Sequence, residues 1–114
     1  NIGKMVRYAE ASAIMEETRY KIVFDIEKRA YWLLKEDEKG PGNLFKKTDG
    51  RFGNKFFLPK DILLKSDKNE LIFLPNGRST KASISVIDDR GKKGYDIKTT
   101  GRAGQTEISS VSEK

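Results

Sequence analysis

Basic and aromatic side chains alternate along residues 45–60, a composition that could bind nucleic acid. The basic residues are Lys46, Lys47, Arg51, Lys55 and Lys60, and the aromatic ones are Phe45, Phe52, Phe56 and Phe57. Lysine and arginine would contact phosphates while the rings stack on single-stranded bases. The alternative is that the rings anchor a long loop to the core and the lysines extend outward. We favour this anchoring alternative, because Phe56-Phe57-Leu58 is typical of a buried run.

Two predicted glycine turns that carry arginine form a second candidate site for binding nucleic acid or a partner. Asn76-Gly77-Arg78 predicts a turn after a short strand, and Gly101-Arg102 predicts a later corner. Gly101 would supply a positive φ there and leave Arg102 in solvent, or Arg102 would contact nucleic acid. The candidate contacts to DNA or to a partner are therefore Lys46, Lys47, Arg51, Arg78, Arg90 and Arg102, with Arg78 extending a basic surface toward Arg90, Lys92 and Lys93.

The acidic residues offer little for catalysis. Glu36-Asp37-Glu38 and Asp88-Asp89 lie in turn-like segments, where neighbouring side chains diverge, and no calcium-loop pattern surrounds them. The sequence contains neither cysteine nor histidine, which removes the thiolate nucleophile, the usual general base near neutral pH and the commonest transition-metal ligands. We expect a protein that is not an enzyme, with no catalytic residues, no metal site and no cofactor.

Length and composition fit one small domain spanning residues 1–114. Hydrophobic residues make up 36% of the chain and charged residues 35%, with a net charge of +6. No segment approaches the ~18 consecutive apolar residues of a membrane span. The positive charge favours anionic partners and does not specify a fold.

The element pattern predicts one helix followed by strands. Alanines and the absence of glycine and proline favour a helix from Lys4 to about Arg19. Its apolar stripe comprises Met5, Val6, Ala9 and Ala13, at spacings of about three and four.

From Tyr20 the apolar period becomes two, which is typical of half-buried strands. Strands are expected at 20–26 and 30–35 as a hairpin, at 55–58 within a long loop, at 61–65, and at 71–74, 82–86 and 95–97 as a terminal meander. One helix followed by strands implies an α+β domain in which the helix packs on antiparallel β-sheet.

The order of these elements, with four local motifs, suggests a family. The motifs are Phe73-Leu74-Pro75-Asn76-Gly77, the Ala82-x-Ile84-x-Val86 strand, the Arg90-Gly91 turn and the Thr100-Gly101-Arg102 ending. Together they resemble the soluble domain of the GspH/FimT minor pseudopilins, which belong to the type IV pilin superfamily. The resemblance implies a pilin-like fold in which residues 1–19 are the C-terminal half of the pilin helix, 20–108 the β-rich part and 109–114 a frayed tail.

The resemblance also implies a function. Such proteins are made with a short leader and a hydrophobic N-terminal helix, which anchors them in the inner membrane while the globular domain lies in the periplasm. In this chain that apolar half would be missing, making it a soluble fragment. Its partners would be other pseudopilins of a type II secretion or type IV pilus-like filament, and secreted cargo. The helix stripe would face neighbouring helices, and the exposed sheet and loop would face other minor pseudopilins or the cargo.

A DNA-binding role is the second hypothesis. Some FimT-like pseudopilins hold DNA through a Gly-Arg-x-Arg motif during natural transformation. This chain matches the motif at Gly101 and Arg102 but has Gly104 in place of the second arginine. This departure places DNA uptake behind filament assembly, and an unrelated soluble α+β domain with a small-molecule or enzymatic role is the third hypothesis.

Overall fold

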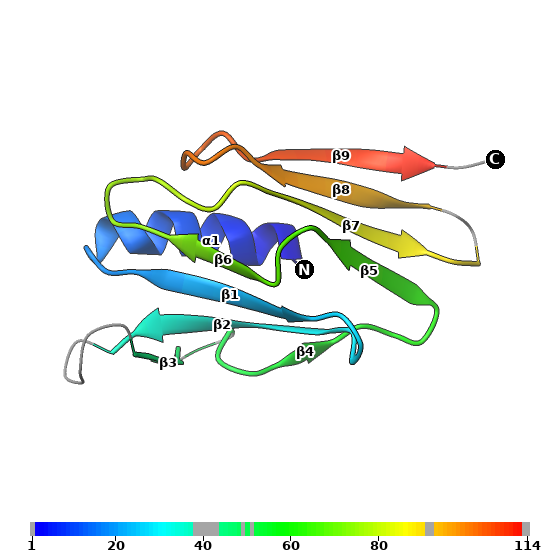
Figure 1. The fold of residues 1–114 in the computed structure, drawn as a ribbon, viewed down its shortest axis with the longest axis horizontal. Helices are drawn as coiled ribbons and strands as arrows, with labels where there is room; N and C mark the ends of the chain where they lie inside the picture. Colours follow the sequence, from blue (N-terminus) through cyan, green and yellow to red (C-terminus); the bar gives the residue numbers. More distant parts are fainter. Residues whose placement is uncertain (1, 38–43, 49, 51, 91–92, 113–114) are drawn as a thin grey trace.

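The structure is a computed structural model that describes residues 2–37, 44–48, 50, 52–90 and 93–112 of the 114-residue chain. In this part of the chain, one helix precedes nine strands (Figure 1). The elements are α1 (Ile2–Met15), β1 (Tyr20–Asp25), β2 (Ala30–Glu36), β3 (Phe45–Lys47), β4 (Phe56–Phe57), β5 (Ile62–Ser66), β6 (Glu70–Phe73), β7 (Ala82–Asp88), β8 (Lys93–Thr99) and β9 (Glu107–Ser112). The predicted α+β class is confirmed.

Helix α1 begins two residues before the predicted start and ends four residues before the predicted end. Glu17 adopts a left-handed φ of 53° immediately after the helix. The Thr18 amide donates to the Ala13 carbonyl at 3.1 Å and the Glu17 amide to the Ile14 carbonyl at 3.4 Å, the two bonds of a Schellman motif. This motif usually has glycine at the left-handed position, so glutamate there gave no signal in the sequence.

Strands β1 and β2 form the predicted hairpin and the centre of the first sheet. They pair from Tyr20↔Lys35 to Asp25↔Ala30. The turn has no glycine or asparagine, but Arg29 takes a φ of 53° and the Lys28 amide donates to the Asp25 carboxylate at 3.2 Å. The first sheet has the order β3-β2-β1-β6, with β4 also paired to β2.

The segment between residues 43 and 59 contains more strand than predicted. β4 lies within the predicted 55–58 strand, and β3 is an additional strand that the irregular sequence did not indicate. Both pair with β2, so the partner strand rather than any local period orders them. The turn predicted at Gly40-Pro41-Gly42-Asn43 lies outside the described residues.

The predicted meander is wrong, because its first strand belongs to a different sheet from the other two. β6 pairs with β1 in the first sheet, whereas β7 and β8 lie in a second sheet of order β5-β7-β8-β9. The chain passes between the sheets over residues 74–81, and the Thr80 amide bonds the Ile72 carbonyl at 3.0 Å on the way. An alternating pattern places residues on a face, but it does not say which strand lies beside them.

The predicted frayed tail is also wrong over residues 109–112. These residues continue β9, which pairs with β8 from Lys98↔Glu107 to Lys93↔Ser112. The serines there have no apolar period, so only the neighbouring strand makes this segment extended.

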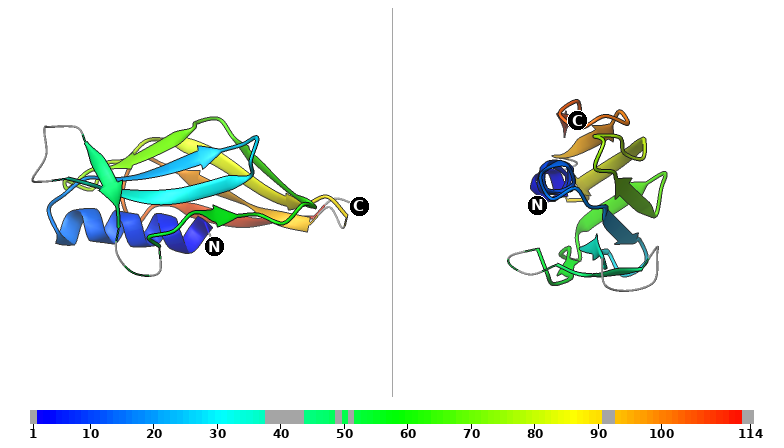
Figure 2. Two further views of the ribbon diagram at one scale, coloured as in Figure 1. Left: turned by 90° about the horizontal axis from the view of Figure 1, so that it is seen from below. Right: turned by 90° about the vertical axis from the view of Figure 1, so that its left-hand side faces the viewer.

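Helix α1 lies along one side of both sheets and closes the core (Figure 2). Met5, Val6, Ala9 and Ala13 are fully buried. They share one cluster with first-sheet residues such as Ile22 and Phe73 and second-sheet residues such as Ile84 and Ile97. The molecule is elongated, with principal extents of 49 × 26 × 22 Å, so the helix, about 21 Å long, covers less than half of its length.

Candidate functional site

The apolar stripe of α1 is not the docking surface that the sequence suggested. Met5, Val6, Ala9 and Ala13 are at 0% exposure within the single chain. They face strands of their own domain and are inaccessible to a neighbouring helix. The prediction that this stripe faces other subunits is corrected: the sheets of the domain already cover it.

A second stripe of α1 is exposed. Lys4, Arg7, Ala11 and Ile14 recur at spacings of three and four, so they lie along one side of the helix. Ile14 keeps 44% of its surface exposed and Tyr8, beside this stripe, 39%. The sequence pattern contained this stripe, but its two cations and single large apolar residue did not distinguish it from an ordinary solvated face.

This stripe forms one wall of a groove whose other wall comes from strands β8 and β9 and from the loop that joins them. Two adjoining cavities of about 440 and 330 Å³ share Arg7. We call them together the α1–β9 groove, lined by Gly3, Lys4, Arg7, Glu10, Ala11, Ile14, Tyr95, Ala103, Gly104, Thr106 and Ile108.

The α1–β9 groove is positively charged. Glu10, its one lining carboxylate, is buried and accepts a hydrogen bond from the Thr106 hydroxyl at 3.0 Å. Lys4 and Arg7 remain at the surface, and within the described part of the chain Arg7 has no ion-pair partner. The groove therefore suits an apolar ligand that also carries negative charge.

The two arginine turns meet at one corner. Arg78 and Arg102 form an antiparallel bridge, and the Ala103 amide donates to the Gly77 carbonyl at 2.7 Å. Gly77 and Gly101 adopt φ values of 87° and 94°, which glycine tolerates without strain. This corner lies at the same end of the molecule as the C-terminal end of α1 (Figure 1), beside a cavity of about 330 Å³ that Ile14 also lines.

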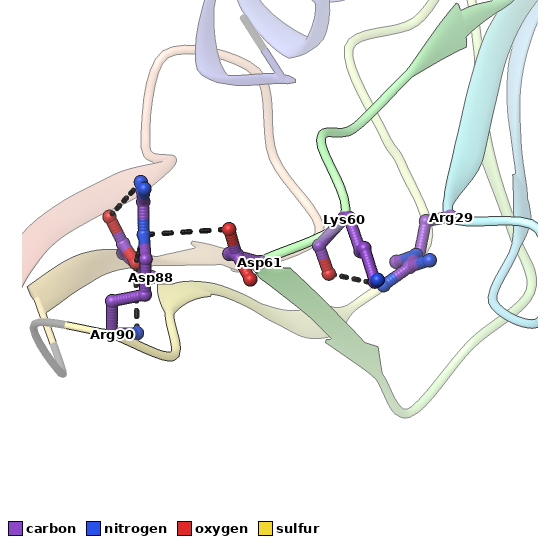
Figure 3. A network of polar contacts seen from close by, with 5 residues as sticks. All are labelled: Arg29, Lys60, Asp61, Asp88 and Arg90. Carbon is purple, nitrogen blue, oxygen red and sulfur yellow. Dashed lines mark hydrogen bonds and ion pairs between the residues drawn. The ribbon is translucent and has the colours of Figure 1, made fainter.

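Arg90 lies at the opposite end, in the β7–β8 turn. The seven-residue strand β8 separates it from the Arg78–Arg102 corner by about 20 Å. Its guanidinium lies 3.3 Å from Asp88 and 3.6 Å from Asp61. Figure 3 shows the two carboxylates on either side of Arg90. The Asp88 carboxylate raises the pKa of Arg90. The expectation of one basic surface joining Arg78 to Arg90 is therefore wrong, because an antiparallel strand places its two turns at opposite ends.

Beside Arg90, a second contact fixes the start of β5. Arg29 donates to the Lys60 carbonyl at 2.5 Å, which joins the β1–β2 turn to the segment entering β5 (Figure 3). Both arginines thus tie loops together within the chain.

Lys46 and Lys47 lie at a third position, on β3. They border a small polar cavity of about 270 Å³ together with Tyr8, Glu16, Tyr20, Lys35 and Thr48. Arg51 lies outside the described residues. The predicted contacts are thus divided among β3, the Arg78–Arg102 corner and the Arg90 turn.

The phenylalanines of this segment mostly pack inside the domain. Phe52 lies 5.0 Å from the Tyr8 ring, and Phe56 stacks on Tyr31 at 5.4 Å. The Lys21 ammonium lies 4.5 Å from the Phe45 ring centre, whereas Phe57 is 66% exposed. One exposed ring is a poor stacking platform for successive bases.

A polar network joins the end of α1 to the first sheet. Glu16 accepts hydrogen bonds from Lys35 at 2.6 Å and from the Tyr20 hydroxyl at 2.7 Å. The Lys35 and Tyr20 donors hold the pKa of the Glu16 carboxyl below its ordinary value, while burial and the Glu16 carboxylate raise the pKa of Tyr20. The Arg19 guanidinium likewise lowers the pKa of Glu36, with which it forms an ion pair.

This network predicts a loss of stability in acid. Because the pKa of Glu16 is lowered on folding, its contribution is present above its ordinary pKa of 4.5 and is lost as the pH falls through the lower folded value. Glu16→Gln should therefore lose less stability than wild type between pH 7 and pH 3. The difference should be about 0.5 kcal/mol, since both partners are partly exposed.

Urea unfolding at the two pH values measures this difference. Glu107→Gln, at an exposed position outside the network, is the matched control and should follow wild type. If all three proteins lost the same free energy of unfolding between pH 7 and pH 3, a stabilising role for the Glu16 contacts would be contradicted.

The described residues contain no group of three or more histidine, cysteine, aspartate or glutamate side chains placed to hold a metal ion. The acidic residues of the two candidate pairs instead contact cations: Glu36 binds Arg19 and Asp88 binds Arg90. The Arg19 guanidinium keeps the Glu36 carboxylate ionised and makes it a poor proton donor.

In the described part of the chain, no helix combines the length and the apolar character needed to cross a membrane.

One helix packed lengthwise on two antiparallel sheets, with its second stripe exposed, defines a pilin-like α+β fold. Two solved structures show the likeness. The minor pseudopilin EpsH from the type 2 secretion system of Vibrio cholerae superimposes with a TM-score of 0.76 at 13% identity, over 97% of this chain and 90% of that one. The type IV minor pilin FimU of Pseudomonas aeruginosa gives 0.65 at 17% identity, over 95% and 82%.

These comparisons confirm the predicted resemblance at the level of fold. No protein-family model matches the sequence, and a search of curated proteins finds no match. The likeness is therefore one of three-dimensional structure.

Proposed function

We propose that this chain is a minor pseudopilin, a non-catalytic subunit of a type II secretion or type IV pilus-like filament. The observation that carries the proposal is the division of α1 into two stripes. One stripe is buried in the domain, and the other, with Arg7, Ala11 and Ile14, is exposed beside a groove. The exposed stripe leaves this side of the helix available to a neighbouring subunit. The fold shared with EpsH and FimU supports the same role.

On this proposal α1 continues toward the N-terminus into an apolar anchor in the bacterial inner membrane, and the described domain lies in the periplasm. The partners are other pseudopilins, which contact the exposed stripe, and secreted cargo. The filament surface left around the Arg78–Arg102 corner is basic and suits acidic partners.

Cysteine cross-linking of the full-length protein in its own cells tests this role. Ala11→Cys, in the exposed stripe, should form cross-links to other filament subunits when these are produced together. Lys98→Cys, on the exposed face of β8 opposite the core, is the matched control and should form few. Equal cross-linking at both positions, or none at Ala11→Cys, would contradict docking through α1.

A DNA-binding pseudopilin for natural transformation is the second candidate. The observation that favours it is the Arg78–Arg102 bridge, which unites two arginines from distant turns at one corner. Each would neutralise a phosphate, so binding should weaken steeply with salt. Gly104, in place of a second motif arginine, weakens this candidate.

Gel shifts at low salt with the chain and duplex DNA test this candidate. Arg102→Ala should weaken binding and reduce the salt slope by about one. Replacing Lys46 and Lys47 should weaken it further only if β3 also contacts DNA. Lys98→Ala removes one charge elsewhere and is the control. No shift of wild type at low salt, or equal losses for Arg102→Ala and Lys98→Ala, would exclude DNA binding at this corner.

A further inference from the structure

The α1–β9 groove lies beside a sheet edge that nothing covers in the described part of the chain. β9 is the last strand of the second sheet and pairs with β8 alone. The described backbone contacts outside the strand ladders include none from Glu107 to Ser112. Among the described residues, one row of backbone donors and acceptors along β9 therefore has no partner.

After the exposed Glu107 at its start, the composition of β9 does not protect this edge. Proteins usually block edge strands with proline, lysine or a bulge. From Ile108 to Ser112 the strand has no proline, glycine or charged residue, and Ile108, Ser109 and Ser110 are exposed. Such an edge can accept a further strand through main-chain hydrogen bonds.

The groove would receive alternate side chains of that strand. Ile108 pairs with the fully buried Ile97 and so lies on the face of the second sheet that carries α1. A strand added beside β9 would direct every second side chain to this face, toward Lys4 and Arg7 of the exposed stripe, which line the same cavity as Ile108. A docked helix could fill the groove but would leave the β9 backbone groups unpaired.

The positive charge of the α1–β9 groove indicates which polypeptide segments could bind there. Lys4 and Arg7 border the groove, while its one lining carboxylate, Glu10, is buried and hydrogen-bonded to Thr106. An acidic residue in the added strand would pair with this positive wall, whereas a lysine would be repelled.

We propose that the α1–β9 groove binds an extended acidic and apolar segment of another polypeptide, which adds as a fifth strand beside β9. This inference deepens the proposed filament role and rests on it for the nature of the partner. In this proposal the neighbouring subunit contacts the groove by adding a strand beside β9, and not by packing a helix against α1.

Eight-residue peptides that alternate valine, isoleucine or phenylalanine with aspartate or glutamate are the probes. Binding is measured by fluorescence anisotropy, and amide hydrogen exchange is measured across the chain. We expect binding that slows exchange in β9. Two versions of the best peptide, N-methylated at odd or at even residues, distinguish strand addition: one version should bind at least about tenfold more weakly than the other.

Charge reversal locates the site. Arg7→Glu should weaken peptide binding by about tenfold, whereas Lys98→Glu, the same charge change on the opposite face, should not. Absence of binding at millimolar peptide, unchanged exchange in β9, equal binding of both methylated versions, or equal effects of the two substitutions would each overturn the proposal. Protection of β9 by increasing protein concentration alone would identify a second copy as the occupant and would overturn it too.

The two proposals fail separately. Cross-links at Ala11→Cys together with a negative peptide result would leave the filament role standing and remove strand addition. Peptide binding without such cross-links would place the groove outside the filament contact.

Discussion

Phe73→Ala should lower the free energy of unfolding by about 3–5 kcal/mol, the range for truncating a buried phenylalanine. Phe73 is 1% exposed and lies in the single core cluster, where side chains of α1 and both sheets meet. Because α1 and both sheets surround Phe73, a cavity left by its ring would be bordered by elements on several sides. Little collapse can offset the loss.

Ile72→Ala in the same strand is the matched control. Ile72 is 36% exposed, and its backbone bonds to Thr80 do not depend on its side chain. Its loss should be about 1 kcal/mol, well below that of Phe73→Ala, since over a third of the Ile72 surface stays in water and no closed cavity forms around it. Urea unfolding monitored by fluorescence of Trp32 measures both. Comparable losses would show that β6 does not present Phe73 to the core as described.

Gly94→Ala should destabilise the chain by at least about 2 kcal/mol, as expected for forced overpacking. A Cβ atom at Gly94 would overlap the Val86 carbonyl oxygen and would lie 2.8 Å from the Ile87 Cα. These are backbone atoms of β7, held by the ladder that pairs Gly94 with Ile87. Relief therefore requires the two central strands of the second sheet to separate locally.

Gly104→Ala is the comparison for Gly94→Ala, because backbone strain and not steric overlap would destabilise it. Its position is open, with nothing within 4 Å of an added Cβ, but its φ is 79°. The expected loss is about 1–2 kcal/mol from the left-handed backbone alone. Gly104→Asn should recover part of it, since asparagine tolerates this conformation. Thermal unfolding of the three variants tests this; a Gly94→Ala loss no larger than that of Gly104→Ala would contradict the steric overlap.

The sequence predicted the elements whose signals are local. The spacing of Met5, Ala9 and Ala13 identified the helix, and the alternation from Tyr20 to Ile26 identified a strand whose partner follows after a short turn. Both signals depend on residues near one another along the chain. The end of α1 was missed because Glu17 occupies a backbone conformation usually signalled by glycine.

For the candidate contact residues too, the sequence predicted the residue types but not their arrangement in space. The sequence supplied the arginines and lysines but placed Arg78 with Arg90, whereas the structure pairs Arg78 with Arg102. The assignment of the helix stripe to neighbouring subunits failed for a related reason. The apolar period predicts that Met5 and Val6 are buried, but it does not indicate whether they are buried by strands of the same chain or by another subunit.

By itself, the sequence determined the fold class, with one amphipathic helix followed by strands, the net charge of +6, and the lack of cysteine and histidine side chains. Its resemblance to pilin-like domains also came from the order of these elements. Only the tertiary structure decided which strands share a sheet, which stripe of α1 remains exposed and that β9 is an edge strand of the second sheet in the described part of the chain. The physical reason is that local periods fix which side of an element is apolar, whereas pairing between strands distant in the chain fixes what that side meets.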